Sequence, residues 1–249
     1  MVTTAQFTVW QMYYVGVDLA WGERSPTGLA VLDCTGHLKH VGVAVSDSEI
    51  VAQLQPYLHE DCVVAVDAPL VVTNPTGNRH CEAALNRDFR RFDAGTHPAN
   101  TGLAWFADGG RGARLSALLN ADKTIEVYPH AASVALFGLD KTLKYKQKPG
   151  RGFDQLQAEL LRLMDFLESL RSAEPNLDLE TDQWAALKAT VFSATRKAQL
   201  RRAEDPVDAV LCAYIARYAT ERPDDVTVYG DEATGCIVTP TYRPSTSSR

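Results

Sequence analysis

The order of the predicted elements favours an α/β layered fold with a mixed β-sheet. Three apolar strands come first, a strongly apolar fourth strand follows one helix, and strands and helices then alternate. The first connection is a hairpin, so the chain does not begin with the βαβ unit of nucleotide-binding folds. Neither GxGxxG nor GxxxxGK[ST] occurs, which agrees with this interpretation.

The first half of the chain contains four predicted strands. Residues 34–37 form a hairpin turn between the second and the third. Asp47 or Ser48 can cap a helix that runs through His59, because apolar residues then recur on one face. The fourth strand is almost continuously apolar, which is typical of a strand covered by helices on both faces. These strands span residues 13–18, 28–33, 38–45 and 62–67.

The second half begins with an irregular insert after the fourth strand, at about residues 70–122. The insert holds one short helix, at about 79–91, and Gly-rich stretches that indicate loops. Pro129 ends a fifth strand that begins at residue 124. Further elements are two helices at about 154–172 and 181–202, and late edge strands at 226–229 and 235–238.

The last strong helix is predicted to begin at Asp205 and to run through Tyr218. Asp205 followed by Pro206 matches an N-cap residue followed by proline at the first helical position. Asp205 therefore has a structural interpretation as a helix cap.

The chain is expected to form a single domain over residues 12–242, because it contains no repeat and no long linker. Extra helices at about 153–203 precede the last core helix, and residues 1–11 and 243–249 are expected to be flexible termini. The 249 residues are 45% hydrophobic and 22% charged, which excludes a disordered chain, a fibrous chain and a disulfide scaffold. The net charge of −6 argues against a protein that coats nucleic acid, but not against a local basic groove.

A cytoplasmic protein without membrane contact is expected. The N-terminal segment lacks the basic region of a secretory signal, and no apolar stretch approaches the roughly 20 residues that span a bilayer. The five cysteines are far apart and form no CxxC, which is typical of reduced thiols and not of a zinc site.

Carboxylates stand at the ends of strongly apolar strands. Asp18 and Asp67 end the first and fourth strands, where an unpaired charge must reach solvent, a donor or a cation. In open α/β sheets the ligand crevice lies outside the carboxyl ends of the strands. Glu126 lies within the fifth strand and is either a solvated position or part of a cluster of acids. A turn or cap role remains the alternative for Asp18 and Asp67.

Asp208 is the fourth candidate, on the last helix. It shares a helical stripe with Leu211, Cys212 and Ile215, so it is expected to point toward the sheet. A role in the helix cap is the alternative. Several ionised carboxylates cannot share a site without a counterion, and hard oxygen ligands favour Mg²⁺ or Mn²⁺. Such a site suits metal-dependent hydrolysis of a phosphodiester.

Five short motifs follow one another along the chain, at residues 15–20, 66–70, 126–129, 144–146 and 205–209. Together they resemble an uncharacterised bacterial and archaeal family of predicted nucleases with an RNase H-like fold. The resemblance covers about residues 13–240 and implies an RNase H-like mixed sheet flanked by helices. That fold carries one acid on the first strand, one on the fourth and one on the last helix, which match Asp18, Asp67 and Asp208. Glu126 fits the family's glutamate-tyrosine-proline motif.

Basic and aromatic segments offer substrate contacts. Five cations lie within residues 141–151, Lys144 and Lys146 among them, and either clamp a phosphate backbone or form a solvated loop. Arg87, Arg90 and Arg91 on the insert helix are further candidates for phosphate contacts. Trp105 and Phe106 either stack on a base or pack under the loop, and Trp21 with Gly22 can shape the mouth of the site.

Three functions are compatible with these features. The first is a metal-dependent nuclease or phosphodiesterase that acts on nucleic acid or a nucleotide, with Asp18, Asp67 and Asp208 as metal ligands and Glu126 as a further catalytic residue. The second is an ATP-dependent phosphotransferase or ATPase of the actin-like superfamily, for which the chain looks short. The third is a catalytically silent binding module. The oligomeric state stays open, a homodimer included.

Overall fold

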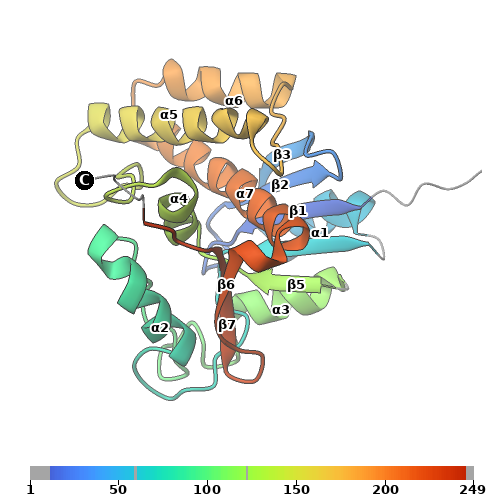
Figure 1. The fold of residues 1–249 in the computed structure, drawn as a ribbon, viewed down its shortest axis with the longest axis vertical. Coiled ribbons are helices and arrows are strands. Elements are labelled where there is room, and N and C mark those ends of the chain that lie inside the picture. Colours follow the sequence, from blue (N-terminus) through green and yellow to red (C-terminus); the bar gives the residue numbers. More distant parts are fainter. Residues whose placement is uncertain (1–11, 59–60, 122, 245–249) are drawn as a thin grey trace, which may run out of the picture.

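A five-stranded sheet forms the centre of the computed structural model (Figure 1). The structure describes residues 12–244 except 59, 60 and 122, so the expected flexible segment 1–11 and most of 243–249 lie outside it. The sheet has the order β3-β2-β1-β4-β5. Its strands are β1 (Tyr13–Asp18), β2 (Thr27–Asp33), β3 (Leu38–Ala44), β4 (Cys62–Val66) and β5 (Lys123–Glu126).

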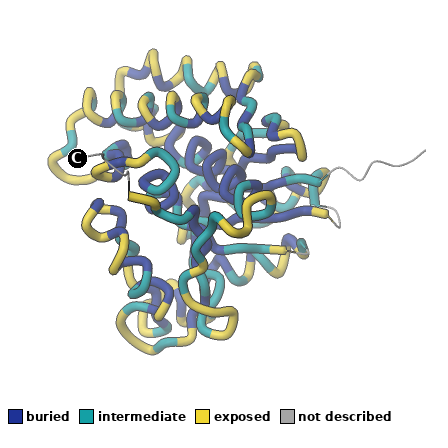
Figure 2. The backbone as a smooth tube through the Cα atoms, in the orientation of Figure 1, coloured by how far each residue is buried: buried dark blue, intermediate teal, exposed yellow. Residues whose placement is uncertain are grey.

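The pairing of the strands makes this sheet mixed. β1 is antiparallel to β2 and parallel to β4, β2 is antiparallel to β3, and β4 is parallel to β5. The predicted α/β fold with a mixed sheet is therefore confirmed, and its strand order is consistent with an RNase H-like core. β1, central and paired on both sides, is buried along almost its whole length (Figure 2).

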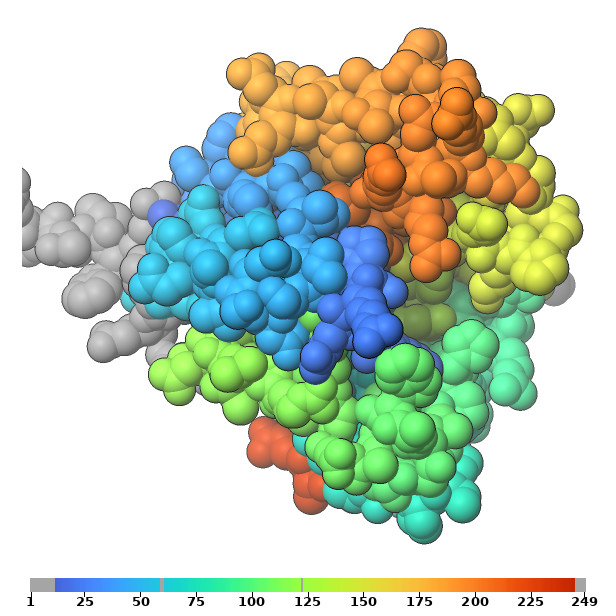
Figure 3. All heavy atoms as spheres, turned by 180° about the vertical axis from the view of Figure 1, so that it is seen from behind, coloured from blue at the N-terminus to red at the C-terminus, as the bar shows by residue number. Residues whose placement is uncertain are grey.

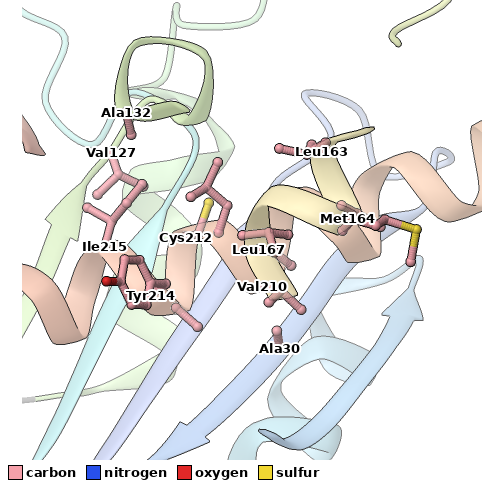
Figure 4. Close-up of a cluster of buried hydrophobic side chains, with 14 of the residues drawn as sticks. Ala30, Val127, Ala132, Leu163, Met164, Leu167, Val210, Cys212, Tyr214 and Ile215 are labelled. Atoms are coloured by element: carbon pink, nitrogen blue, oxygen red, sulfur yellow. The ribbon is translucent and has the colours of Figure 1, made fainter. Parts of the chain in front are cut away.

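Helices cover both faces of the sheet. On one face α7 lies across β1, β2 and β4, and α5 and α4 pack against α7. Figure 4 shows Leu163, Met164 and Leu167 together with residues of α7 in this larger core. On the other face α1 and α3 enclose a smaller core around β1 and β4. The helices are α1 (Asp47–Leu54), α2 (His80–Phe89), α3 (Gly110–Leu119), α4 (Pro129–Phe137), α5 (Phe153–Ser169), α6 (Asp182–Phe192) and α7 (Lys197–Glu221).

Two glycines allow α7 to lie directly on the sheet. A Cβ atom added at Gly16 would overlap the carbonyl oxygen of Ala209, and one added at Gly28 would overlap that of Asp205. Backbone therefore meets backbone at both points, and the height of α7 above β1 and β2 is set without intervening side chains.

The predicted start of the last helix is wrong. α7 begins at Lys197, so Asp205 and Pro206 lie inside the helix and Asp205 is not its N-cap. The side chain of Gln199 instead accepts the backbone N–H of Arg196 at 3.0 Å at the true start. An internal proline costs about 3 kcal/mol, but burial of α7 along most of its length outweighs this cost. The helix predicted at 181–202 is accordingly two helices, α6 and the first turns of α7.

The predicted edge strands are not part of the main sheet. β6 (Val226–Asp231) and β7 (Gly235–Pro240) form a separate two-stranded antiparallel sheet, which packs against α2. A single bridge between Val127 and Val238 links β7 to the segment after β5. Short 3-10 helices occupy Gln55–Tyr57, Arg90–Phe92, Leu170–Ser172 and Pro223–Asp225.

Three local predictions are corrected by the structure. Ser46 caps α1, because its hydroxyl accepts the N–H of Glu49 and the Glu49 carboxylate accepts the N–H of Ser46. α3 begins inside the Gly-rich stretch that was interpreted as a loop, since Gly112 lets its first turn lie on the carbonyl of Pro69. Pro129 is the first residue of α4, a position whose backbone N–H makes no hydrogen bond within a helix, so proline costs nothing there.

Candidate functional site

Asp18 and Asp67 lie side by side at the carboxyl ends of two parallel strands. Gly16 faces α7, and because side chains alternate along a strand, Asp18 faces α7 as well. Ala65 pairs with Gly16 in register, which places Asp67, two residues later, over the same face. The N–H of Asp67 donates to the carbonyl of Val17 at 2.8 Å and ties the two chain segments together.

α7 brings Asp208 to the same place. Its stripe of Leu211, Cys212 and Ile215 packs toward the sheet, as predicted, and the contact between Gly16 and Ala209 lies one residue from Asp208. The side chain of Asp208 is fully buried. The hydroxyl of Tyr145 donates to its Oδ1 at 2.6 Å, whereas its Oδ2 accepts no hydrogen bond from any described residue.

The ammonium group of Lys146 lies between two of the carboxylates. Its Nζ is 3.0 Å from Oδ2 of Asp18 and 2.6 Å from Oδ2 of Asp208. The contact with Asp18 is also a hydrogen bond, whereas the geometry of the contact with Asp208 is that of an ion pair alone. Burial lowers the pKa of Lys146, but the charges of Asp18 and Asp208 outweigh this effect and hold the pKa well above its usual value.

The carboxyl groups in this cluster outnumber its cation. Burial raises the pKa of Asp18 to about 7, with Lys146 acting against the rise and Asp208 adding to it. Burial also raises the pKa of Asp67 well above its usual value, and the charge of Asp18 adds to that rise. Burial is the main cause of both raised values, and repulsion between the acids, which Lys146 only partly offsets, adds to it.

Two further acids on α7 were missed as site residues. Glu204 is buried one turn before Asp208, and its Oε1 has no hydrogen-bond partner among the described residues. Burial raises the pKa of Glu204 to about 7 and that of Asp205 to about 6. The spacing of four residues between Glu204 and Asp208 was the available signal, because it places both on one helix face. It was obscured by the wrong helix start.

The donor chemistry of the cluster suits a hard divalent cation, since Asp18, Asp67 and Asp208 offer only carboxylate oxygens, and Oδ2 of Asp208 has an ion pair with Lys146 but no hydrogen bond from a described residue. As the side chains stand, no group of three or more His, Cys, Asp or Glu among the described residues is arranged to hold a metal ion. Lys146 Nζ takes the position between Asp18 and Asp208. A metal at this point therefore requires Lys146 to move away.

Glu126 lies near these acids but in a different environment. It pairs in register with Val66, whose side chain packs on the α1 and α3 face, so Glu126 leaves the sheet on the opposite face from Asp18 and Asp67, although it lines the same cleft. The guanidinium of Arg79 donates to both of its oxygens, at 2.5 and 2.8 Å, and the N–H of Leu70 donates at 3.0 Å. Burial raises the pKa of Glu126, although Arg79 acts against the rise.

Glu82 completes this second group of charges. It accepts the Nε of Arg79 at 2.9 Å and the N–H of Ala99 at 3.1 Å. The side chains of Arg79 and Glu82 are almost fully buried. The three residues Arg79, Glu82 and Glu126 therefore clamp the insert to the end of β5.

The candidate phosphate contacts fall into two sets. Lys144 and Lys146 line the cleft above the carboxylates, and Lys144 also pairs with Asp93 at 3.0 Å. Arg87, Arg90 and Arg91 are exposed on or just after α2, and none of them lines the cleft.

The cleft has a volume of about 670 Å³ and opens on the face shown in Figure 3, between the dark blue segment after β1, the yellow segment near residue 150 and the orange start of α7. His130 lies in its wall beside the hydroxyl of Thr142, at 3.2 Å. Burial lowers the pKa of His130 to about 4, and the charge of Lys146 adds to the effect. His130 is therefore neutral at physiological pH.

None of the described helices is both long and apolar enough to cross a membrane.

A family model described as a protein of unknown function (DUF429) matches residues 16–234. Searches of curated proteins and of solved structures gave no match. The chain belongs to the DUF429 family, and the matched range includes Asp18, Asp67, Lys146 and Asp208.

Proposed function

We propose that this member of the family hydrolyses phosphodiester bonds in nucleic acid or a nucleotide, with Mg²⁺ or Mn²⁺ as its cofactor. One observation carries the proposal: Asp18, Asp67 and Asp208 converge from two parallel strands and a helix on one cleft, with a single lysine as counter-charge. Uncompensated carboxylates destabilise a fold, so a cluster of this kind is typical of a functional site.

Asp18, Asp67 and Asp208 are the residues that would hold the cation. When bound, the cation would supply an activated water and neutralise charge that develops on the phosphate. The hydroxyl of Tyr145 fixes Asp208 through its Oδ1 and leaves Oδ2 directed at the cluster. Glu204 and Asp205 add negative charge beside it and favour a divalent over a monovalent cation.

Lys146 holds the cluster together until substrate and cation arrive. Its ammonium group balances Asp18 and Asp208, which would otherwise repel each other at close range. A phosphate that enters the cleft offers Lys146 an alternative anionic partner. In this proposal Lys146 moves from the carboxylates to the phosphate and becomes a substrate-binding residue.

The remaining proposed residues have supporting roles. Glu126 is the further catalytic residue expected from the sequence, and its contacts with Arg79 favour a positioning role at the end of β5. Lys144 is a second phosphate contact on the cleft wall. We also propose a cytoplasmic location, because all five cysteines are free thiols.

Asp18→Asn tests this function directly. The full chain is expected to bind Mn²⁺ and to hydrolyse bis(p-nitrophenyl) phosphate in a Mn²⁺-dependent manner. Asp18→Asn should lower the Mn²⁺ affinity and reduce hydrolysis by about 100-fold or more, because a charged ligand is lost. Mn²⁺ affinity is measured by electron paramagnetic resonance titration, and hydrolysis by release of p-nitrophenol.

Asp140→Asn is the matched control, because Asp140 is exposed and lies outside the cleft. It should leave both quantities unchanged, and circular dichroism should show that both variants fold. Undiminished Mn²⁺ affinity in folded Asp18→Asn would overturn the metal assignment.

A further inference from the structure

Two exposed tryptophans stand on one wall of the cleft. Trp21 is 43% exposed and Trp105 is 56% exposed, and both line the cleft that ends at Asp18 and Asp67. Large apolar side chains left in solvent near a polar site are typical of ligand contacts. Phe106, in contrast, is buried with Val72 and Ala99, so it belongs to a small hydrophobic cluster under the loop.

Each tryptophan packs against the residue next to the other one. The ring of Trp21 packs edge-on against Phe106 with centroids 5.4 Å apart. The ring of Trp105 lies against Gly22, where an added Cβ would be 3.4 Å from its Cζ3. Both indoles are therefore anchored on one side and open to the cleft on another.

A buried arginine fixes the backbone of this wall. The guanidinium of Arg111 donates to the carbonyl of Ala20 at 2.8 Å and to that of Gly22 at 3.0 Å, on either side of Trp21. It also pairs with Asp47 at the start of α1. The position of Trp21 is thus set before any ligand binds, which reduces the entropy lost on binding.

Unpaired cations line another part of the same cleft. Lys148, Arg151 and Arg201 all contribute to its lining, and none of the three forms a salt bridge with any described residue. Arg151 is oriented by a hydrogen bond from its Nη1 to the carbonyl of Lys146. The cleft therefore combines cations that form no salt bridge with a described residue, two exposed indole rings and the carboxylates of Asp18 and Asp67.

We infer that the substrate is single-stranded nucleic acid whose unpaired bases stack on Trp21 and on Trp105 while its phosphates contact Lys148, Arg151 and Arg201. Proteins that bind single strands combine cations for the backbone with aromatic rings for the bases. A duplex hides its base faces in the helical stack and cannot use the tryptophans. This inference rests on the proposed function, because it names the substrate of the same site.

The test measures binding in EDTA, so that it does not depend on hydrolysis. Fluorescence anisotropy is recorded for a labelled dT 12-mer, an abasic 12-mer of equal charge and a 12-base-pair duplex. The full chain should bind the dT 12-mer most tightly. Trp21→Ala and Trp105→Ala should each weaken dT binding by about 5- to 150-fold, the range for the loss of one stacked base, and leave abasic binding unchanged.

Phe192→Ala is the control, because Phe192 is an aromatic residue that is 76% exposed on α6, outside this cleft. It should change none of the three affinities. Equal affinity for the dT and abasic strands, or tighter binding of the duplex, would overturn the inference. Hydrolysis of the small diester with unaltered strand binding in the tryptophan variants would refute the stacking alone. Trp-dependent binding without hydrolysis would refute only the proposed reaction.

Discussion

Two groups of buried acids lie at the same end of the sheet and differ in how their oxygens are satisfied. In the group of Arg79, Glu82 and Glu126, hydrogen bonds from one guanidinium and from backbone N–H groups reach all four carboxylate oxygens. In the cluster of Asp18, Asp67 and Asp208, one lysine serves several acids, and Oδ2 of Asp208 accepts no hydrogen bond within the described part of the chain.

The difference separates a structural use of charge from a functional one. A buried ion group in which every oxygen accepts a hydrogen bond is already compensated by the protein and gains little from an added cation. A cluster with spare oxygens and raised pKa values is destabilised as it stands and gains from an added cation or proton. Glu126 therefore belongs to the structural group, whereas Asp18 and Asp67 belong to the functional cluster.

The largest expected effect is on stability at the structural group. Arg79→Met leaves Glu82 and Glu126 buried without a counter-charge, so it should lower the free energy of unfolding by about 3–5 kcal/mol. Urea denaturation followed by circular dichroism measures this change. Arg87→Met, at an exposed position on α2, should stay within about 0.5 kcal/mol of the parent. Equal effects of the two variants would contradict the structural role of the group of Arg79, Glu82 and Glu126.

A change of opposite sign is expected at the functional cluster. Asp67→Asn removes one of the repelling carboxylates and leaves Lys146 with Asp18 and Asp208 as partners. The variant should raise the free energy of unfolding by about 1 kcal/mol at pH 7 while it lowers hydrolysis. Glu126→Gln, measured in the same urea series, should destabilise. A loss of stability in Asp67→Asn would show that its carboxylate is structural.

A further effect is expected on the pH dependence of stability. The pKa of Asp18 is about 7 in the fold against 3.8 for a free side chain, so the folded state binds this proton more tightly. Its contribution to stability is present below pH 3.8 and is lost as the pH rises through 7. The loss is at most ~1.4 kcal/mol per pH unit for one proton. Urea midpoints between pH 4 and 8 should fall less steeply in Asp18→Asn, and an unchanged slope would contradict the raised pKa.

The positions of Asp18, Asp67 and Asp208 were predictable because they depend on short-range patterns. An apolar strand that ends in an acid places that acid at the sheet edge. Asp208 was correctly expected to point toward the sheet even though the helix start was wrong by eight residues, since its stripe with Leu211 and Ile215 does not depend on where the helix begins.

The surroundings of these acids were not predictable from local patterns. Glu126 alternates within its strand, but only the pairing with Val66 decides which face it occupies, and that register is a long-range property. Lys146 was expected, with Lys144 and from the motif at residues 144–146, to contact phosphate, but nothing in the spacing of the loop cations indicates that its ammonium group lies between two carboxylates. The choice among them is made by the path of residues 139–152 across the cleft.

The contact between Gly16 and Ala209 has a consequence for how this molecule can change. It fixes the spacing of Asp18 and Asp208 by peptide geometry, whereas most distances in a protein interior depend on how side chains pack. Random replacements in the core would therefore lower the melting temperature long before they moved the two acids apart. A single methyl group added at Gly16 would do the reverse, by lifting α7 and separating the acids while the rest of the core keeps its composition.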